Sequence, residues 1–260
     1  MKVLILAGGF GTRISEESHL KPKPMIEIGE MPILWHIMKY YSSYGLNDFI
    51  ILAGYRQYVI KEYFANYFLH NADITFDMSN NQMEVHSSAS ENWRVTVVDT
   101  GLRTMTGGRV KRVRDYVKDE PFMLTYGDGV CDVDLDALLR YHRSHGKIAT
   151  ITTVNLAQQK GVLDIAEDGS IRSFREKEEM DGAAINGGFM VFQPELFEYL
   201  EGDETVLEQE PMHRLAADGE LMSFYHRGFW QCMDTQREKR LLEALWESGR
   251  APWKRWKDER

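Results

Sequence analysis

The sequence predicts an α/β protein with a mainly parallel central sheet, and the pattern of its apolar residues supports this. Short apolar runs alternate along the chain with segments whose apolar residues recur at helical spacing, as strands and helices do around a parallel sheet. None of the 260 residues lies in a run approaching the roughly 18 apolar residues that a membrane span requires. We expect one domain over residues 1–260, with halves near 1–150 and 151–260.

The expected elements follow from apolar pattern and from helix start and stop signals. Strands are expected at residues 3–7, 49–53, 95–98, 122–125, 148–154 and 185–192. A helix over 32–44 should begin on Pro32 and end at Gly45, and a helix over 134–144 should end before Gly146. Further helices are expected over 59–69 and 234–246.

Two stretches interrupt this alternation and are expected to form hairpins. Residues 74–78 and 83–86 alternate in polarity around the turn-forming residues 79–82, within an insertion near 71–93. Residues 162–165 and 171–174 flank a second turn, at the start of a mixed C-terminal part. The first hairpin and a tail with Trp253 and Trp256 carry more apolar surface than a monomer leaves wet, which predicts a homo-oligomer.

Composition restricts the class of partner and the compartment. The net charge of −9 argues against a nucleic-acid groove, so any site for a small anion must be built locally. Two cysteines cannot form a disulfide framework, which favours a reducing cytoplasm. The N-terminus passes directly into an apolar run and then glycines, without a cleavage site, so secretion and membrane attachment are not expected.

Glycines follow the first expected strand directly, in the segment Gly8-Gly9-Phe10-Gly11-Thr12-Arg13. Backbone N–H groups free of side chains can surround a polyphosphate there, and Arg13 adds a planar cation. A tight turn leaving the strand is an equally simple interpretation. The spacing excludes a dinucleotide fingerprint, which would need a glycine or alanine where Ile14 stands, and a Walker loop, which would need Lys-Ser or Lys-Thr.

A lysine between two prolines comes about ten residues later, in Lys21-Pro22-Lys23-Pro24-Met25. Prolines fix φ and remove backbone donors, so Lys23 should be presented by a stiff, extended segment. A lone lysine is usually a surface residue, but this rigidity next to an anion-binding loop favours contact with phosphate.

Two aspartates are candidates for a metal site. Asp128 follows the strand over 122–125, where open α/β sheets place their ligands, although a turn-forming role is equally simple. Asp234 precedes the last expected helix and could instead be its N-cap. Together the two carboxylates could hold magnesium, with water and phosphate oxygens completing the octahedron.

The segments 6–13 and 22–25 resemble the signature of the sugar-1-phosphate nucleotidylyltransferases. The segments 35–38, 105–109, 126–129 and 229–235 are similar to the members that use CTP and glucose 1-phosphate. The resemblance covers nearly the whole chain, including the insertion.

The resemblance implies a Rossmann-like nucleotidyltransferase fold, with a nucleotide-binding and a sugar-phosphate-binding half. It also implies Mg²⁺ on Asp128 and Asp234 and a homo-oligomer, as a trimer or hexamer. The implied activity is transfer of a cytidylyl group from CTP to a sugar 1-phosphate, first of all α-D-glucose 1-phosphate. The products would be pyrophosphate and CDP-glucose for deoxysugar or surface polysaccharide biosynthesis, such as lipopolysaccharide O-antigen.

Roles follow for single residues. Arg13 and Lys23 are expected to be catalytic. The residues expected to bind nucleotide are Leu6, Ala7, Gly8, Gly9, Gly11, Thr12, Arg13, Lys23, Thr106, Gly107, Arg109 and Asp128. Small residues at 106–108 would let a flat base approach the backbone, although they could simply begin a helix; cytosine itself is implied only by the resemblance. The residues expected on the sugar-phosphate side are Glu176, Lys177, Asn186 and Gly188.

Some features leave alternatives open. Residues 159–162 depart from the Arg-Phe-Gly-Ala stretch usual in the enzymes that act on glucose, so a different phosphorylated acceptor is one alternative. A non-catalytic nucleotide-sugar-binding regulatory protein is another. Cys131 and Cys232 lie near the aspartates, but without a Cys-x-x-Cys or clustered histidines they are expected to be structural thiols.

Overall fold

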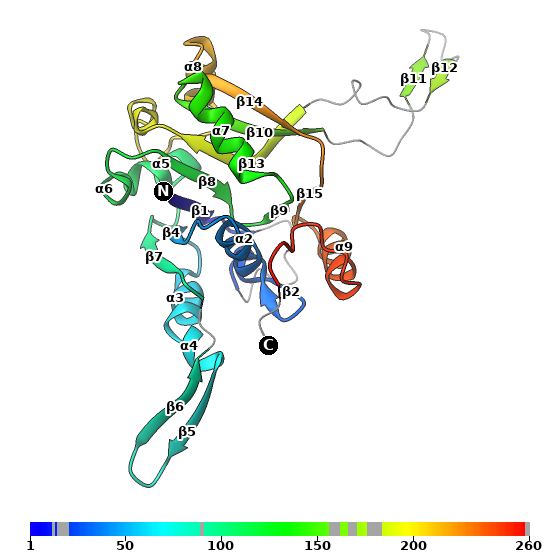
Figure 1. Cartoon of the computed structure of the whole chain (residues 1–260). Coiled ribbons are helices and arrows are strands. Elements are labelled where there is room, and N and C mark those ends of the chain that lie inside the picture. The colour runs from blue at the N-terminus through cyan, green and yellow to red at the C-terminus, as the bar shows by residue number, and fades with distance from the viewer. Residues whose placement is uncertain are drawn as a thin grey trace.

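A seven-stranded sheet forms the centre of the molecule (Figure 1). The structure is a computed structural model that describes residues 1–11, 14, 21–88, 91–155, 162–165, 171–175 and 184–257. In spatial order the strands are β14 (Leu221–His226), β10 (Ala149–Asn155), β13 (Ala184–Phe192), β8 (Phe122–Tyr126), β1 (Lys2–Ala7), β4 (Asp48–Ala53) and β7 (Arg94–Asp99). Neighbours are parallel except where β13 runs antiparallel to both β10 and β8. The expected mainly parallel sheet and its six expected strands are confirmed.

Helices cover both faces of the sheet because successive strand residues point to opposite sides. Val3 and Ile5 belong to one buried cluster, and Leu4 and Leu6 to the other. The first cluster is covered by α2 (Ile33–Ser42), α3 (Gln57–Ala65), α7 (Leu135–His145) and α9 (Gln236–Glu247). The second is covered by α5 (Thr106–Arg112), α6 (Arg114–Val117), the 3₁₀ segment η4 (Pro194–Tyr199) and α8 (Glu210–Ala217).

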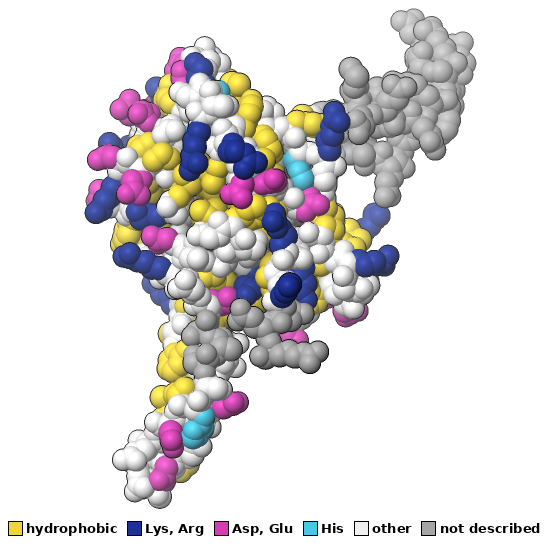
Figure 2. Space-filling model, viewed as in Figure 1, with side chains coloured by type: hydrophobic (Ala, Val, Ile, Leu, Met, Phe, Trp, Pro, Cys, Tyr) yellow, Lys and Arg dark blue, Asp and Glu magenta, His cyan; other side chains and the backbone are white. Residues whose placement is uncertain are grey.

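Short antiparallel pairs are attached to this frame. They are β2 (Glu27–Ile28) with β3 (Met31–Pro32), β5 (Ala72–Asp77) with β6 (Gln82–Ser88), β9 (Gly129–Cys131) with β15 (Trp230–Cys232), and β11 (Val162–Ile165) with β12 (Ile171–Arg175). Both expected hairpins, β5–β6 and β11–β12, are therefore present. The first projects away from the body (Figures 1 and 2).

One expected helix is wrong in its length. Residues 59–69 belong to two helices, α3 and α4 (Tyr67–His70), which are separated at Asn66. Asn66 leaves the helical region with ψ near 1°, and its side chain donates to the carbonyl of Glu62. An asparagine side chain offers the backbone an alternative to the helical ladder, so the pattern overestimated continuity.

The expectation that the C-terminal tail is covered by another subunit is wrong. Trp253 is 0% exposed within its own chain, where its ring stacks on Phe229 at 5.6 Å between centroids. Trp256 packs edge-on against Trp35 of α2 at 5.5 Å. The tail therefore completes the core on the α2 side of the sheet. Among the residues that the structure describes, no helix could cross a membrane.

Candidate active site

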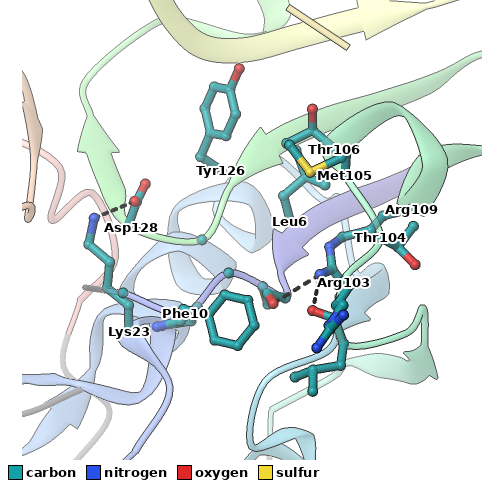
Figure 3. A pocket seen from close by; sticks show the side chains of 17 residues that line it. Leu6, Phe10, Lys23, Arg103, Thr104, Met105, Thr106, Arg109, Tyr126 and Asp128 are labelled. Carbon is teal, nitrogen blue, oxygen red and sulfur yellow. Dashed lines mark hydrogen bonds and ion pairs between the residues drawn. The ribbon is translucent and has the colours of Figure 1, made fainter. Parts of the chain in front are cut away.

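A cavity of about 400 Å³ opens at the C-terminal ends of β1 and β8 (Figure 3). These strands are parallel neighbours, with Leu6 opposite Tyr126, so the loops that follow them meet at one edge of the sheet. Many of the residues expected to bind nucleotide line it. The lining residues are Leu6, Ala7, Gly8, Gly9, Phe10, Gly11, Lys23, Pro24, Leu102, Arg103, Thr104, Met105, Thr106, Arg109, Tyr126, Gly127 and Asp128.

The glycine loop needs its first glycine for contact with a buried arginine. A Cβ at Gly8 would lie 2.2 Å from Cζ of Arg109, whereas one at Gly9 would meet nothing within 4 Å. The Gly8 carbonyl accepts from Nη2 of Arg109 at 3.0 Å and from the N–H of Tyr55 at 3.2 Å. Two donors thus hold the loop at the Gly8 carbonyl, while the space next to Gly9 is open.

Arg109 lines the cavity, but its guanidinium is occupied by the protein itself. It is 5% exposed and donates to the Gly101 carbonyl at 2.7 Å and the Thr100 hydroxyl at 2.8 Å, in addition to Gly8. Burial, together with the nearby Arg112, lowers the pKa of its guanidinium. Arg109 therefore joins the loop after β1 to the loop after β7 and places a positive charge at the base of the cavity.

Lys23 reaches the cavity from a short 3₁₀ turn, η2 (Lys23–Met25), that begins after extended Pro22. The expected extended conformation thus ends at Pro22, and the turn buries Lys23 to 7% exposure. Its ammonium group donates to Oδ2 of Asp128 at 2.6 Å and also to Oδ1 of Asp234. Burial lowers the pKa of the Lys23 ammonium, but the two carboxylates outweigh burial and raise it above the usual 10.5.

The two aspartates are 106 positions apart and are brought together by a strand pair. β9 begins one residue after Asp128, β15 ends two residues before Asp234, and Gly129 lies opposite Cys232. The carbonyl of Asp128 accepts from the N–H of Met233 at 2.8 Å. Asp234 is not the N-cap of α9, because Thr235 takes that position in a capping box.

The two carboxylates fit a divalent ion such as magnesium. Oxygens from both converge on one cation, the Lys23 ammonium, which stands where an ion shared between them would lie. Magnesium is usually bound by one or two carboxylates together with phosphate oxygens and water. The neighbouring cavity has room for that phosphate and water. Lys23 and a metal ion would therefore compete for the same two carboxylates.

The glycines at the start of α5 make room for a protein loop and not for a base. A Cβ at Gly107 would lie 2.9 Å from the Thr205 carbonyl, and one at Gly108 would lie 2.7 Å from Cα of Asp203. The N–H of Gly107 donates to that same Thr205 carbonyl at 2.9 Å. Gly107 is not among the residues lining the cavity, whereas Thr106 is. The space for a flat base expected at Gly107 is thus filled by residues 203–207.

Asn186 and Gly188, which are expected on the sugar-phosphate side, do not line the cavity themselves but contact Tyr126, which does. Gly188 has φ +90°, and a Cβ there would lie 2.7 Å from the Tyr126 ring. The Asn186 amide donates to the Tyr126 hydroxyl at 3.3 Å and accepts from the Gly188 N–H at 2.9 Å. Burial and the negative charge of Glu208 raise the pKa of Tyr126, so its hydroxyl stays protonated.

Sequence comparisons agree with this geometry. The nucleotidyl transferase family model matches residues 2–247. The chain belongs to this family. A glucose-1-phosphate cytidylyltransferase from Salmonella typhi is 59% identical over 257 residues, which cover 98% of this chain and 100% of that protein. A probable glucose-1-phosphate cytidylyltransferase from Bacillus subtilis (strain 168) is 44% identical with the same coverage.

A solved structure has a similar fold. The crystal structure of a putative glucose-1-phosphate thymidylyltransferase from Bacillus anthracis, in complex with a sucrose, superposes with a TM-score of 0.71. It is 16% identical and covers 100% of this chain and 98% of that chain, a level that supports the fold alone. The nucleotidyltransferase fold expected from the sequence is confirmed.

Four expected site residues of this nucleotidyl transferase lie outside the described residues. They are Thr12 and Arg13 of the glycine loop and Glu176 and Lys177 of the sugar side. The departure at 159–162 also falls there except for Val162. Their roles remain predictions.

Sequence reasoning missed Glu208, whose carboxylate accepts from both the Tyr126 and the Thr106 hydroxyls at 2.6 Å. It lies in an irregular segment, with no glycine or proline motif beside it that would have singled it out.

The Cys232 thiol lies beside the carboxylates and donates to Oδ2 of Asp234 at 3.7 Å. Burial raises the pKa of both thiols, Cys131 and Cys232, to about 12, so both are neutral near pH 7. Ligand atoms of Cys131, Asp132 and His226 do lie within 4.8 Å of one another. However, Nε2 of His226 is already 2.9 Å from Asp132 and 3.2 Å from the Phe229 carbonyl. This arrangement ties the loop before β15 to the end of β9.

Proposed function

We propose that the chain transfers a cytidylyl group from CTP to α-D-glucose 1-phosphate, giving CDP-glucose and pyrophosphate. The observation that carries the proposal is the meeting of Lys23, Asp128 and Asp234 beside the glycine-loop cavity. The Salmonella typhi relative, 59% identical across 98% of the chain, supports CTP and glucose 1-phosphate as the substrates. The surface-polysaccharide and deoxysugar role of the product and a cytoplasmic location belong to the same proposal.

The reaction needs positioning and charge neutralisation more than proton transfer. A non-bridging oxygen of glucose 1-phosphate attacks the α-phosphorus of CTP, and the bond from that phosphorus to the β-phosphate oxygen breaks. The attacking oxygen is already anionic, so no general base is required. The N–H groups of the loop Gly8 to Thr12 would hold the triphosphate, with Arg13 beside it.

Lys23 has to change partners during this cycle. Its ammonium is held by Asp128 and Asp234, and in the reaction we assign it to the α-phosphate, where negative charge increases in the transition state. Magnesium on the two aspartates would supply Lewis-acid stabilisation of the phosphoryl oxygens. Loss of Lys23 should therefore reduce turnover on the order of a hundredfold.

The sugar phosphate is assigned to the second half of the chain. Lys177 would neutralise its phosphate, with Glu176 beside it, and Asn186 and Gly188 would face the sugar ring. Asn186 lies next to the cavity, because its amide donates to the hydroxyl of Tyr126, a residue of the cavity wall, at 3.3 Å. Lys177→Ala should raise the KM for every sugar 1-phosphate alike, because a phosphate contact carries no information about the ring.

A homo-oligomer, as a trimer or hexamer, completes the proposal. Phe76 and Met78 on the projecting hairpin are 59% and 82% exposed, and Met83 and Val85 are also exposed. Apolar side chains on an isolated hairpin favour burial against another subunit. Light scattering should give a multiple of the 30.2 kDa chain mass, and a monomer mass would contradict this part.

The decisive experiment is a pyrophosphate-release assay with a panel of nucleoside triphosphates and sugar 1-phosphates. CTP with glucose 1-phosphate should give the highest kcat/KM. Higher activity with another sugar would identify a different acceptor. No release with any pair, together with an unchanged melting temperature in CTP and Mg²⁺, would reject the enzymatic function.

A further inference from the structure

Glu208 stands behind one wall of the cavity, at the boundary between the nucleotide and the sugar halves. Tyr126 at the end of β8 and Thr106 at the start of α5 lie on the same wall (Figure 3). The Glu208 carboxylate, half-buried, accepts from the Tyr126 hydroxyl with one oxygen and from the Thr106 hydroxyl with the other, each at 2.6 Å. Glu208 itself does not line the cavity.

The segment that carries Glu208 is held firmly on α5. The N–H groups of Met105 and Gly107 donate to the carbonyls of Asp203 and Thr205. Arg112 forms a two-pronged ion pair with the Asp203 carboxylate. These contacts fix the backbone before Glu208, so the position of the Glu208 carboxylate does not depend on its two hydroxyl partners alone.

The carboxylate sets the direction of both hydroxyl groups. A carboxylate accepts and does not donate, so the Tyr126 and Thr106 protons must point toward Glu208 and away from the cavity. The Thr106 oxygen additionally accepts from the N–H of Leu207 at 2.9 Å, and the Tyr126 oxygen accepts from Asn186. Each hydroxyl can then offer the cavity only a lone pair, which suits a substrate group that donates.

A structural role alone accounts poorly for a carboxylate at this position. Among the described residues, the structure records no ion pair for Glu208. A half-buried charge without a cation costs free energy that a neutral glutamine would largely avoid. The charge is therefore best explained by what it does to the two hydroxyls.

We infer that Glu208 is a positioning residue that couples the two substrate sites by orienting Thr106 on the nucleotide side and Tyr126, with Asn186, on the sugar side. This rests on the proposed function, because it assigns the two sides of one wall to CTP and to the sugar phosphate. Loss of Glu208 should disturb both sites, although Glu208 touches neither substrate.

The test compares Glu208→Ala and Glu208→Gln with Glu204→Gln, a matched loss of one charge at an exposed position of the same loop. Measured quantities are the KM for each substrate at saturation of the other, kcat, the Kd for CTP alone and the melting temperature. Glu208→Ala should raise both KM values on the order of tenfold, the effect of losing an oriented hydrogen bond at each site. Glu208→Gln should recover the KM on one side only, because its single carbonyl oxygen accepts from one hydroxyl and its NH₂ group cannot accept from the other.

Variants that remove only one of the two hydroxyls show what the loss of a single contact does to each KM. Thr106→Val should raise mainly the KM for CTP, and Tyr126→Phe mainly that for the sugar phosphate. KM does not depend on the fraction of folded enzyme, so a merely structural Glu208 would lower the melting temperature and leave both KM values unchanged. That result, or a change confined to one substrate in Glu208→Ala, would overturn the inference.

The same experiment separates the inference from the proposed function. Wild type and Glu204→Gln report whether CTP and glucose 1-phosphate are substrates at all. If another pair from the panel is preferred, the Glu208 variants are compared on that pair, and unchanged KM values there would still overturn the coupling. If no pair reacts, equal CTP affinity in wild type and Glu208→Ala would overturn it.

Discussion

Replacing Lys23 by methionine should tighten divalent metal binding to the nucleotide-free protein. The ammonium of Lys23 occupies the position between Asp128 and Asp234 that an ion would share, so an incoming ion must displace it. Methionine keeps the length of the side chain without its charge. The metal would then meet two carboxylates that no longer hold the Lys23 ammonium.

The magnitude follows from the two hydrogen bonds that the metal must break. A hydrogen bond to a charged group contributes about 1.5–3 kcal/mol. The Asp128 and Asp234 side chains are 29% and 20% exposed, so solvent screening reduces the pair to roughly 2–4 kcal/mol together. At 1.4 kcal/mol per tenfold, the Kd for the metal should fall by about 30- to 700-fold.

Mn²⁺ titration followed by electron paramagnetic resonance measures this without any turnover. Lys21→Met is the matched control, because Lys21 pairs with Glu27 at 2.6 Å on the surface and its removal changes the charge equally. With CTP present the advantage of Lys23→Met should shrink, because the triphosphate offers the ammonium of the wild type new anions. Equal Mn²⁺ affinity of Lys23→Met and wild type without CTP would refute the competition.

Three further outcomes test other parts of the structure. Gly8→Ala should lower Tm by roughly 3–10 °C, and Gly9→Ala should not, because only the first Cβ meets the guanidinium below the loop; equal melting would contradict this contact. Burial lowers the pKa of His36 from 6.5 to about 4, so stability present above pH 6.5 should be lost as pH falls toward 4, by about 3 kcal/mol. Urea unfolding of His36→Asn should show a flatter pH dependence, and an unchanged slope would count against the assignment. Trp253→Ala should lower the free energy of unfolding by about 3–5 kcal/mol in the same assay, and a loss below 1 kcal/mol would show that the tail lies outside the core.

Six of the seven sheet strands, and the meeting of the glycine loop with Lys23 and Asp128, were predictable because local signals determine them. Apolar runs bounded by glycine and proline located the six strands to within two residues. The glycine loop, Lys23 and Asp128 each lie beside such a strand or in a rigid segment, so their convergence follows from parallel pairing. Asp234 is a candidate from its place before the last helix and from the resemblance, but its meeting with Asp128 is not predictable, because pairing of β9 with β15 is not visible in either segment alone.

The remaining features depend on contacts between distant segments. The antiparallel direction of β13 is set by chain connections, and no residue within the strand signals it. Gly107 was interpreted as space for a base because the sequence does not reveal that residues 203–207 fill that space. Glu208 was missed for the same reason, since its partners Thr106 and Tyr126 lie about a hundred positions earlier.

The pairing of β9 with β15 also determines when during synthesis the chain can bring Asp128 and Asp234 together. A nascent chain of about 200 residues already contains the strands β1, β4, β7, β8, β10 and β13, which form most of the sheet. It also contains Lys23 and Asp128, but not Asp234, which enters only with the last quarter of the chain. Domains generally fold as units during and after synthesis. A chain truncated before β15 therefore lacks one of the two carboxylates, and no N-terminal fragment of that length can hold an ion between both.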